Sequence, residues 1–201
     1  NRIVSLLALC PWLMVAVVGC GPSAVESQPP QEDMVTDVPA DPTAIRPFEI
    51  TVPDSVLESF LEEIGRLTQP AVLLPGNHDS YDDNSLYQRD VFKDKPNNLH
   101  IITQSGGEAL SFPGLTLDVW GRAMLSHTPA FRPLEGMPTQ RNDHWMVALA
   151  HGHFHFDDDR DQRSSPIYPP EVEAAPCDYL ALGHWDRHVD VSQGEVTAVY
   201  S

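Results

Sequence analysis

Side chains that can bind a metal ion or a phosphate follow three short apolar segments of this 201-residue sequence. They are Asn77, His78 and Asp79 after the first segment, His151 at the end of the second, and His184 and Asp186 after the third. Imidazole nitrogens together with amide and carboxylate oxygens suit Mn, Fe or Zn. Three such segment ends in one small domain indicate convergence on a single divalent-metal site.

The three apolar segments must be the elements that position these side chains. Residues 71–74, 145–150 and 179–182 are short, apolar and bounded by turn residues, which predicts strands buried on both faces. Ligands of open α/β sheets bind at the carboxyl ends of such strands. The alternative for the first segment is a tight turn, in which Gly76 and Asn77 supply positive φ and His78 is an exposed bystander.

Further patterns predict an α/β domain around these strands. Residues 51–68 place apolar side chains at a 3.6-residue period, which predicts an amphipathic helix leading into the strand at 71–74. Additional strands are expected at 99–103, at 108–112 and 115–120 as a hairpin, and at 195–200 as an edge strand. Residues 121–143 have little periodicity and are expected to form a loop.

Composition restricts the classes of function. Hydrophobic residues make up 41% of the chain, which is enough for a core, and the formal charge is −17. So acidic a surface disfavours non-specific nucleic-acid binding. Three cysteines without CxxC spacing exclude a cysteine-based zinc site and a multi-disulfide framework, and Cys177 is expected to be a lone buried or half-buried thiol.

The N-terminal region has the composition of a targeting segment. Residues 3–18 are almost wholly apolar after Arg2, as in the hydrophobic part of a secretory signal. The segment ends at Cys20 in a sequence that resembles the lipobox of bacterial lipoproteins. We therefore expect a signal segment at 1–20, with membrane attachment through lipidated Cys20. The alternatives are a buried helix followed by a loop, and a cytoplasmic protein in which these residues are not a genuine leader.

The composition changes again after Cys20. Residues 21–47 are acidic and rich in proline, which predicts a flexible linker. Residues 48–201 form the expected domain. Because a signal segment and a linker are expected before it, the whole chain is expected to be a cell-envelope lipoprotein.

The motifs of the 48–201 domain resemble the calcineurin-like metallophosphoesterases. The sequence GNHD, a strand ending in HG, and a GHxH-like GHWD occur in the same order as in the downstream part of the sequences of that family. The segments DVWGRAM, AHGH, RSSPI and DYLALGHW are similar to its DNA-repair exonuclease branch. This resemblance implies a partial metallophosphoesterase fold of two stacked mixed sheets flanked by helices, with the first βα part missing.

The same resemblance implies roles for individual residues. Asn77, His151 and His184 would bind the second metal of a two-metal site, most often Mn. His78 would stabilise the transition state or protonate the leaving oxygen, and Asp79 would orient His78.

The chain departs from the family at the first metal. No DxH pair precedes the GNHD sequence, where the family carries one, and Ile45-Arg46 occupy the place of the Gly-Asp that carries the bridging carboxylate. Asp186 replaces the last histidine of the family, although a carboxylate can still bind metal. Either a pseudo-enzyme or a fragment with an unrelated leader explains these losses.

Two functions follow from this pattern. The first is a metal-dependent phosphoesterase-family hydrolase domain with weak or no activity, whose substrate is a phosphoester. Nucleic acid is suggested as that substrate by resemblance alone and is disfavoured by the net charge. The second is a non-catalytic envelope lipoprotein that binds one metal or a partner through the same scaffold.

The remaining histidines have simpler expectations. His127 and His144 are expected at the surface. His153 and His155 are expected in a solvated loop, with a local metal site alongside His151 as the alternative. His188 is expected in the turn after GHWD, with a place beside Asp186 as the alternative.

Overall fold

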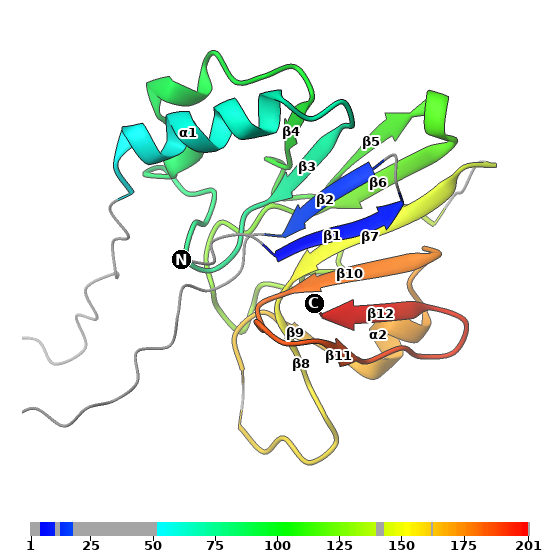
Figure 1. Ribbon diagram of the computed structural model, residues 1–201. Coiled ribbons are helices and arrows are strands. Elements are labelled where there is room, and N and C mark those ends of the chain that lie inside the picture. The colour runs from blue at the N-terminus through cyan, green and yellow to red at the C-terminus, as the bar shows by residue number, and fades with distance from the viewer. Residues whose placement is uncertain (1–4, 11–12, 18–51, 140–142, 162, 201) are drawn as a thin grey trace, which may run out of the picture.

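Strands dominate the structure, and the fold is mixed α/β. The computed structural model describes residues 5–10, 13–17, 52–139, 143–161 and 163–200. This part of the chain forms a four-stranded sheet, a six-stranded sheet, a two-stranded sheet and two α-helices (Figure 1). The α/β class predicted from the sequence is therefore confirmed.

The four-stranded sheet, here called sheet A, has the order β1-β2-β3-β4. Its strands are β1 (Ser5–Cys10), β2 (Leu13–Val17), β3 (Ala71–Leu74) and β4 (Leu99–Ile101). β1 and β2 are antiparallel, whereas β2, β3 and β4 run parallel. The helix α1 (Asp54–Gly65) connects β2 to β3, as the right-handed βαβ crossover of parallel strands requires a covering helix.

The six-stranded sheet, sheet B, has the order β11-β12-β10-β7-β6-β5. Its strands are β5 (Glu108–Phe112), β6 (Leu117–Gly121), β7 (Trp145–His151), β10 (Tyr179–Gly183), β11 (Val189–Asp190) and β12 (Thr197–Tyr200). The four central strands β6, β7, β10 and β12 are parallel, and the antiparallel β5 and β11 form the two edges.

Short elements complete the described chain. β8 (His153–Phe154) and β9 (Pro166–Ile167) pair as a small parallel sheet, and α2 (Pro169–Glu173) follows directly. Three 3₁₀ turns lie at Leu86–Gln88, Asp90–Phe92 and Pro113–Leu115.

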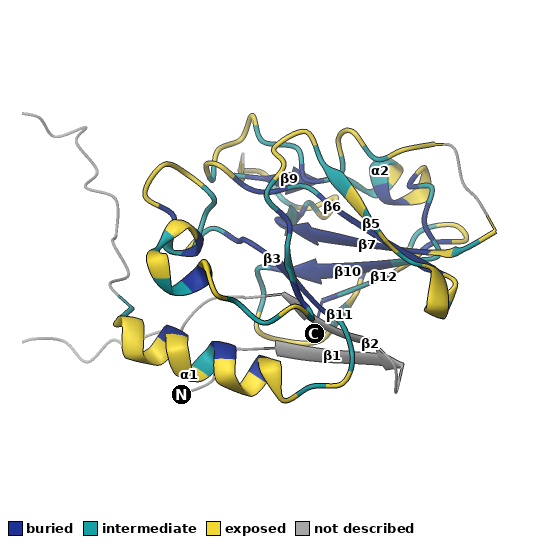
Figure 2. Ribbon diagram, turned by 90° about the horizontal axis from the view of Figure 1, so that it is seen from above, coloured by how far each residue is buried: buried dark blue, intermediate teal, exposed yellow. Residues whose placement is uncertain are grey.

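Apolar contacts stack the elements in layers. Leu57, Leu61 and Ile64 of α1 pack on Ala71 and Leu73, which lie on one face of β3. The alternate residues Val72 and Leu74 point to the other face and pack against sheet B, including Val147 and Leu149 of β7. The far face of sheet B is covered by the segment that carries α2. Figure 2 shows β7 and β10 buried, while α1 exposes its outer side.

Most predicted strands are present within a residue or two, but one expectation about this fold was wrong. The strand at 195–200 is not an edge strand, because β11 pairs with the outer side of β12. Before α1 in the chain, β2 runs parallel to β3. β2 has the sequence LMVAV, so it supplies a strand but none of the DxH ligand residues.

The segment with the composition of a secretory signal therefore has a paired, extended backbone in β1 and β2. Cys20 and the linker expected at 21–47 lie outside the described residues. Among the helices of the described part, none has the length and apolar character needed to cross a membrane.

Candidate metal-binding site

Three strand ends from two sheets meet at one place. β7 and β10 are parallel neighbours with Gly183 paired to His151, so His151 and His184 emerge side by side. β3 packs on β7 from sheet A, and the turn after β3 brings Asn77 to the same point. Asn77 Oδ1 lies 2.7 Å from His151 Nε2 and 3.3 Å from His184 Nδ1. The structure thus brings together the three residues that the sequence assigned to one metal.

This geometry fits a divalent cation. Two ligand atoms at about 2.1 Å from one metal and at right angles to each other are about 3.0 Å apart, and the two distances to Asn77 Oδ1 bracket that value. Oδ1 accepts hydrogen bonds only. If His151 carries its proton on Nδ1, the lone pair of Nε2 faces the oxygen lone pairs, an arrangement that a cation between them would stabilise.

His151 is deeply buried. Its ring is 2% exposed, and within the described residues its Nδ1 has no hydrogen-bond partner. Burial, together with the neighbouring imidazoles of His184, His127 and His78, lowers the pKa of His151 to about 3. The ring is therefore neutral near pH 7, which is the form that binds metal.

Gly76 makes room for that ring. A Cβ atom added at Gly76 would lie 2.5 Å from His151 Cε1 and 2.6 Å from His151 Nδ1, closer than atoms in contact can approach. A glycine between β3 and Asn77 is therefore required by the close approach of the loop to the imidazole.

His184 has an unusual backbone conformation. Its φ is 123°, in a region that favours glycine and that other residues adopt mainly where the surrounding structure enforces it. Burial and the imidazoles of His127, His153 and His78 lower the pKa of His184 to about 4. The chain thus holds a second neutral imidazole against Asn77 in a strained conformation.

Asp79 stabilises the loop that carries Asn77. Its Oδ1 accepts a hydrogen bond of 2.9 Å from the Gly76 N–H, and its Oδ2 accepts one from the Tyr87 hydroxyl. Burial raises the pKa of Asp79, opposed by these hydrogen bonds and by the nearby His78. His78 itself is exposed and lies close enough to influence the pKa of His127, His151 and His184. The predicted pair of His78 and Asp79 therefore borders the site.

The structure does not bring Asp186 into this group. It lies exposed in the turn after β10, and none of the contacts that join Asn77, His151 and His184 includes it. His188, the candidate neighbour of Asp186, is also exposed.

Two histidines that sequence reasoning placed in solvated or surface positions belong to the site. The ring centroids of His127 and His153 lie 5.4 Å and 6.1 Å from that of His184, and both residues are only partly exposed. Ser165 Oγ lies 3.0 Å from His127 Nδ1, and Asp159 Oδ2 lies 3.3 Å from His153 Nε2. Alternation with His151 was the one sequence signal for His153, whereas His127 follows no pattern.

The neighbouring histidines differ from these two. His155 stacks on Tyr168 at 5.1 Å, and His144 pairs with Asp118 at 3.0 Å beside the opposite end of β7. Cys177 is buried, as the sequence predicted.

Residues of the classes His, Cys, Asp and Glu do not form a metal-binding group of three or more anywhere in the described ranges. The Asn77, His151 and His184 group contains two imidazoles and one amide. If it binds a cation, the amide oxygen of Asn77 must be one of the ligands.

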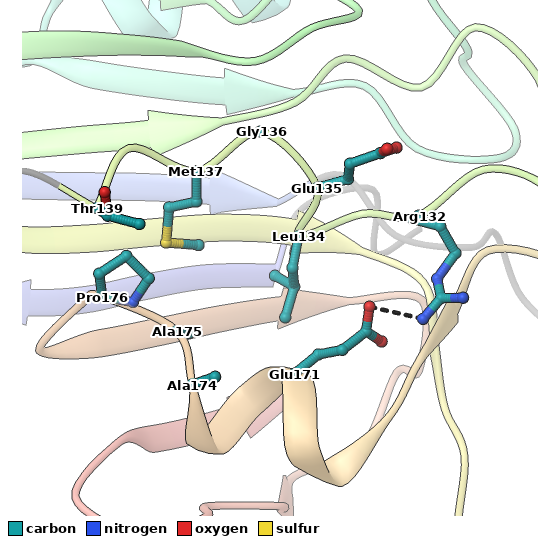
Figure 3. Close-up of a pocket in the computed structure, with 10 residues that line it drawn as sticks. All are labelled: Arg132, Leu134, Glu135, Gly136, Met137, Thr139, Glu171, Ala174, Ala175 and Pro176. Atoms are coloured by element: carbon teal, nitrogen blue, oxygen red, sulfur yellow. Dashed lines mark ion pairs between the residues drawn. The ribbon is translucent and has the colours of Figure 1, made fainter.

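A separate cavity of about 480 Å³ lies between the 132–139 loop and α2. Figure 3 shows Arg132 and Glu171 at one end, joined by an ion pair of 2.6 Å, and Thr139 with Pro176 at the other. This cavity shares no residue with the group around Asn77. It is therefore distinct from the candidate metal site.

Neither a scan against protein-family models nor a search of curated proteins found a match for this chain. A functional assignment therefore depends on the motif residues and on their arrangement in space.

Proposed function

We propose that the chain is a metal-dependent phosphoesterase-family hydrolase domain that holds one divalent cation, preferentially Mn²⁺, and hydrolyses phosphoesters at a small fraction of ordinary enzyme rates. The observation that supports it best is the approach of His151 Nε2 and His184 Nδ1 to the single oxygen Asn77 Oδ1. These atoms come from the ends of three separate parallel strands, the position in which α/β sheets bind ligands.

The residues of the chain divide the chemistry among them. A bound cation would polarise a phosphoryl oxygen and neutralise charge that develops during displacement. Asn77, His151 and His184 would hold that cation. His78, exposed beside the group, would donate a proton to the leaving oxygen. Asp79 would keep the Asn77 loop and His78 in place through its bonds to Gly76 and Tyr87.

Weak activity follows from what accompanies this group. No DxH pair precedes the strand that leads to Asn77, and Asp186 is exposed. A two-metal phosphoesterase uses the second cation to stabilise the attacking oxygen. With ligands for one cation alone, the barrier to that attack remains high.

A second candidate is a non-catalytic envelope protein that uses the same group to hold one metal or a partner. The exposed position of Asp186 favours this non-catalytic candidate. Hydrolysis would need a further metal, and the carboxylate that remains as a candidate ligand for it, Asp186, is exposed. The two candidates differ in turnover, so the same assay separates them.

The test is a titration of the full chain with Mn²⁺, followed by an assay with bis-p-nitrophenyl phosphate. We expect one Mn²⁺ per chain, loss of binding in Asn77→Ala and in His151→Gln, and hydrolysis at a small fraction of ordinary enzyme rates. Two equivalents with ordinary rates would refute the weak-activity proposal. No bound Mn²⁺ would reduce the domain to a scaffold, and one equivalent with no turnover would favour the second candidate.

A further inference from the structure

We propose that His127 is a substrate-binding residue, whose Nε2 donates a hydrogen bond to a phosphoryl oxygen bound beside His184 while Ser165 holds its ring in place. This inference rests on the proposed function, since it assigns the place of the phosphoester at the same site.

The His127 ring lies next to the candidate metal site. The His127 and His184 ring centroids are 5.4 Å apart, and His184 in turn lies against Asn77 and His151. His127 therefore lies beside one of the two imidazoles that face Asn77 Oδ1. The loop that carries His127 comes from the 121–143 region, so this imidazole reaches the group from outside the three strand ends.

Ser165 holds the His127 ring in place. Ser165 is fully buried, and its φ of 49° lies in the left-handed region. Its N–H donates to Thr128 O at 2.8 Å, while its carbonyl accepts a hydrogen bond of 3.0 Å from the His153 N–H. Ser165 therefore ties the residue after His127 to β8 and presents its hydroxyl to His127 Nδ1 at 3.0 Å. A non-glycine residue held in this conformation indicates a positioning role.

The second ring nitrogen of His127, Nε2, is the atom that would bind the ligand. Ser165 occupies Nδ1, and among the described residues nothing hydrogen-bonds His127 Nε2, although this atom is open to solvent. When the Ser165 hydroxyl donates to Nδ1, the proton of the ring lies on Nε2.

The chemistry of the site indicates which ligand His127 would bind. An N–H group that is free beside a cation site complements an oxygen acceptor that the cation also binds. The nearby carboxylates do not compete, because Asp79 accepts hydrogen bonds from Gly76 and Tyr87, and Asp159 accepts one from the Phe156 N–H and approaches His153. In a site without the family ligands of the first metal, His127 would bind the phosphoryl oxygens that such a metal would otherwise face.

The experiment measures the affinity of the full chain, loaded with one equivalent of Mn²⁺, for inorganic phosphate by calorimetry. His127→Ala should weaken phosphate binding by about tenfold, since a hydrogen bond to a charged group is worth that much or more. Its Mn²⁺ affinity should not change. His155→Ala is the matched control, because it removes an imidazole that stacks on Tyr168 instead of facing His184.

Two variants of Ser165 test the positioning role. Ser165→Ala removes the hydroxyl and keeps the strained φ, whereas Ser165→Gly removes the hydroxyl and relaxes it. Both should weaken phosphate binding by a similar factor, and Ser165→Gly should keep the thermal midpoint of the parent or raise it. A loss in Ser165→Gly alone would mean that the strained backbone, not the hydrogen bond, matters.

The remaining outcomes separate this inference from the proposed function. Unchanged phosphate affinity in His127→Ala would overturn the inference, as would absence of phosphate binding by the parent chain. Loss of Mn²⁺ affinity in His127→Ala would also overturn it, because His127 would then be a metal ligand. If the parent chain binds no Mn²⁺, the proposed function fails, and the phosphate titration of the metal-free protein still decides whether His127 binds phosphate.

Discussion

At the scale of single residues, Gly76 has the tightest constraint at the candidate site. We expect Gly76→Ala to displace the His151 ring, since the added Cβ would lie 2.5 Å from its Cε1. Mn²⁺ affinity should fall by about tenfold or more, as when the support of a metal ligand is disturbed, and the free energy of unfolding should fall by about 1–3 kcal/mol. Mn²⁺ titration and urea denaturation measure the two effects.

Gly114→Ala is the control for this variant. Gly114 has no atom within 4 Å of an added Cβ, so the same change of side chain meets open space. Equal effects of the two substitutions on Mn²⁺ affinity and on the free energy of unfolding would show that the close approach of Gly76 to His151 contributes to neither.

Residues at strand ends could be predicted from the sequence, and residues held by loops could not. Asn77, His151 and His184 each follow an apolar segment, so strand prediction placed each of them at a strand end, and the structure brings these ends together from two sheets. His127 depends on the backbone conformation of Ser165, and no local pattern specifies that partner 38 residues away. Asp186 was assigned by motif spacing, but the turn after Gly183 directs it to solvent.

At the scale of elements, Asn98 joins α1 to sheet A. Its side-chain amide donates to the carbonyls of Ile64, Leu67 and Gln69 at 2.8, 3.1 and 3.3 Å, at and just beyond the end of α1. The Ile64 carbonyl also accepts a hydrogen bond of 3.0 Å from the Leu67 N–H, so Asn98 adds a side-chain donor at the C-terminal end of α1 from a distant segment.

Removal of this donor should destabilise the fold. We expect Asn98→Ala to lower the free energy of unfolding by about 1–3 kcal/mol, because carbonyl groups in a part-buried place lose a donor. The neighbouring Asn97 is exposed, which makes Asn97→Ala a control with the same change of side chain. Equilibrium denaturation in urea provides the comparison, and equal midpoints for both variants would contradict the role of Asn98.

Elements with strong periodicity agree with their predictions, whereas elements made by tertiary contacts do not. β3 has the predicted bounds, and α1 begins at Asp54 after Pro53 instead of at Thr51. β8, β9 and β11 have two residues each, too short for any alternation to be seen. The pairing of β11 with β12 depends on a turn, which is why β12 was taken for an edge strand.

At the scale of the whole molecule, the contact between the two sheets defines both the core and the site. Val72 and Leu74 of β3 bury their side chains against sheet B, and the same contact brings Asn77 to His151. Burial lowers the pKa of three imidazoles at this junction, those of His127, His151 and His184. Protonation of these three rings therefore acts against folding at the place where the sheets meet.

The stability of the metal-free chain should fall in acid. The pKa of His151 is about 3 and that of His184 about 4 in the folded state, against 6.5 in the unfolded chain. The unfolded state thus binds more protons below pH 6.5, and the stabilisation present above that pH is lost as the pH falls toward 4. The raised pKa of Asp79 acts in the opposite direction, but it concerns one group. We expect urea unfolding in a chelator to show a loss of about 2 kcal/mol per pH unit between pH 5.5 and 4.5.

The variant His151→Gln tests the source of that slope. Because His151 is 2% exposed, its removal should reduce the slope by about 1.4 kcal/mol per pH unit, the value for one proton, whatever it does to stability at pH 7. His188→Gln removes an exposed imidazole outside the group and should keep the slope of the parent. If the slope of His151→Gln equals that of the parent, the acid sensitivity arises elsewhere, and the buried neutral state of His151 loses its support. A reduced slope in this variant alone would place the protonation that opposes folding at the junction of the two sheets, where the same neutral imidazole is available to a cation.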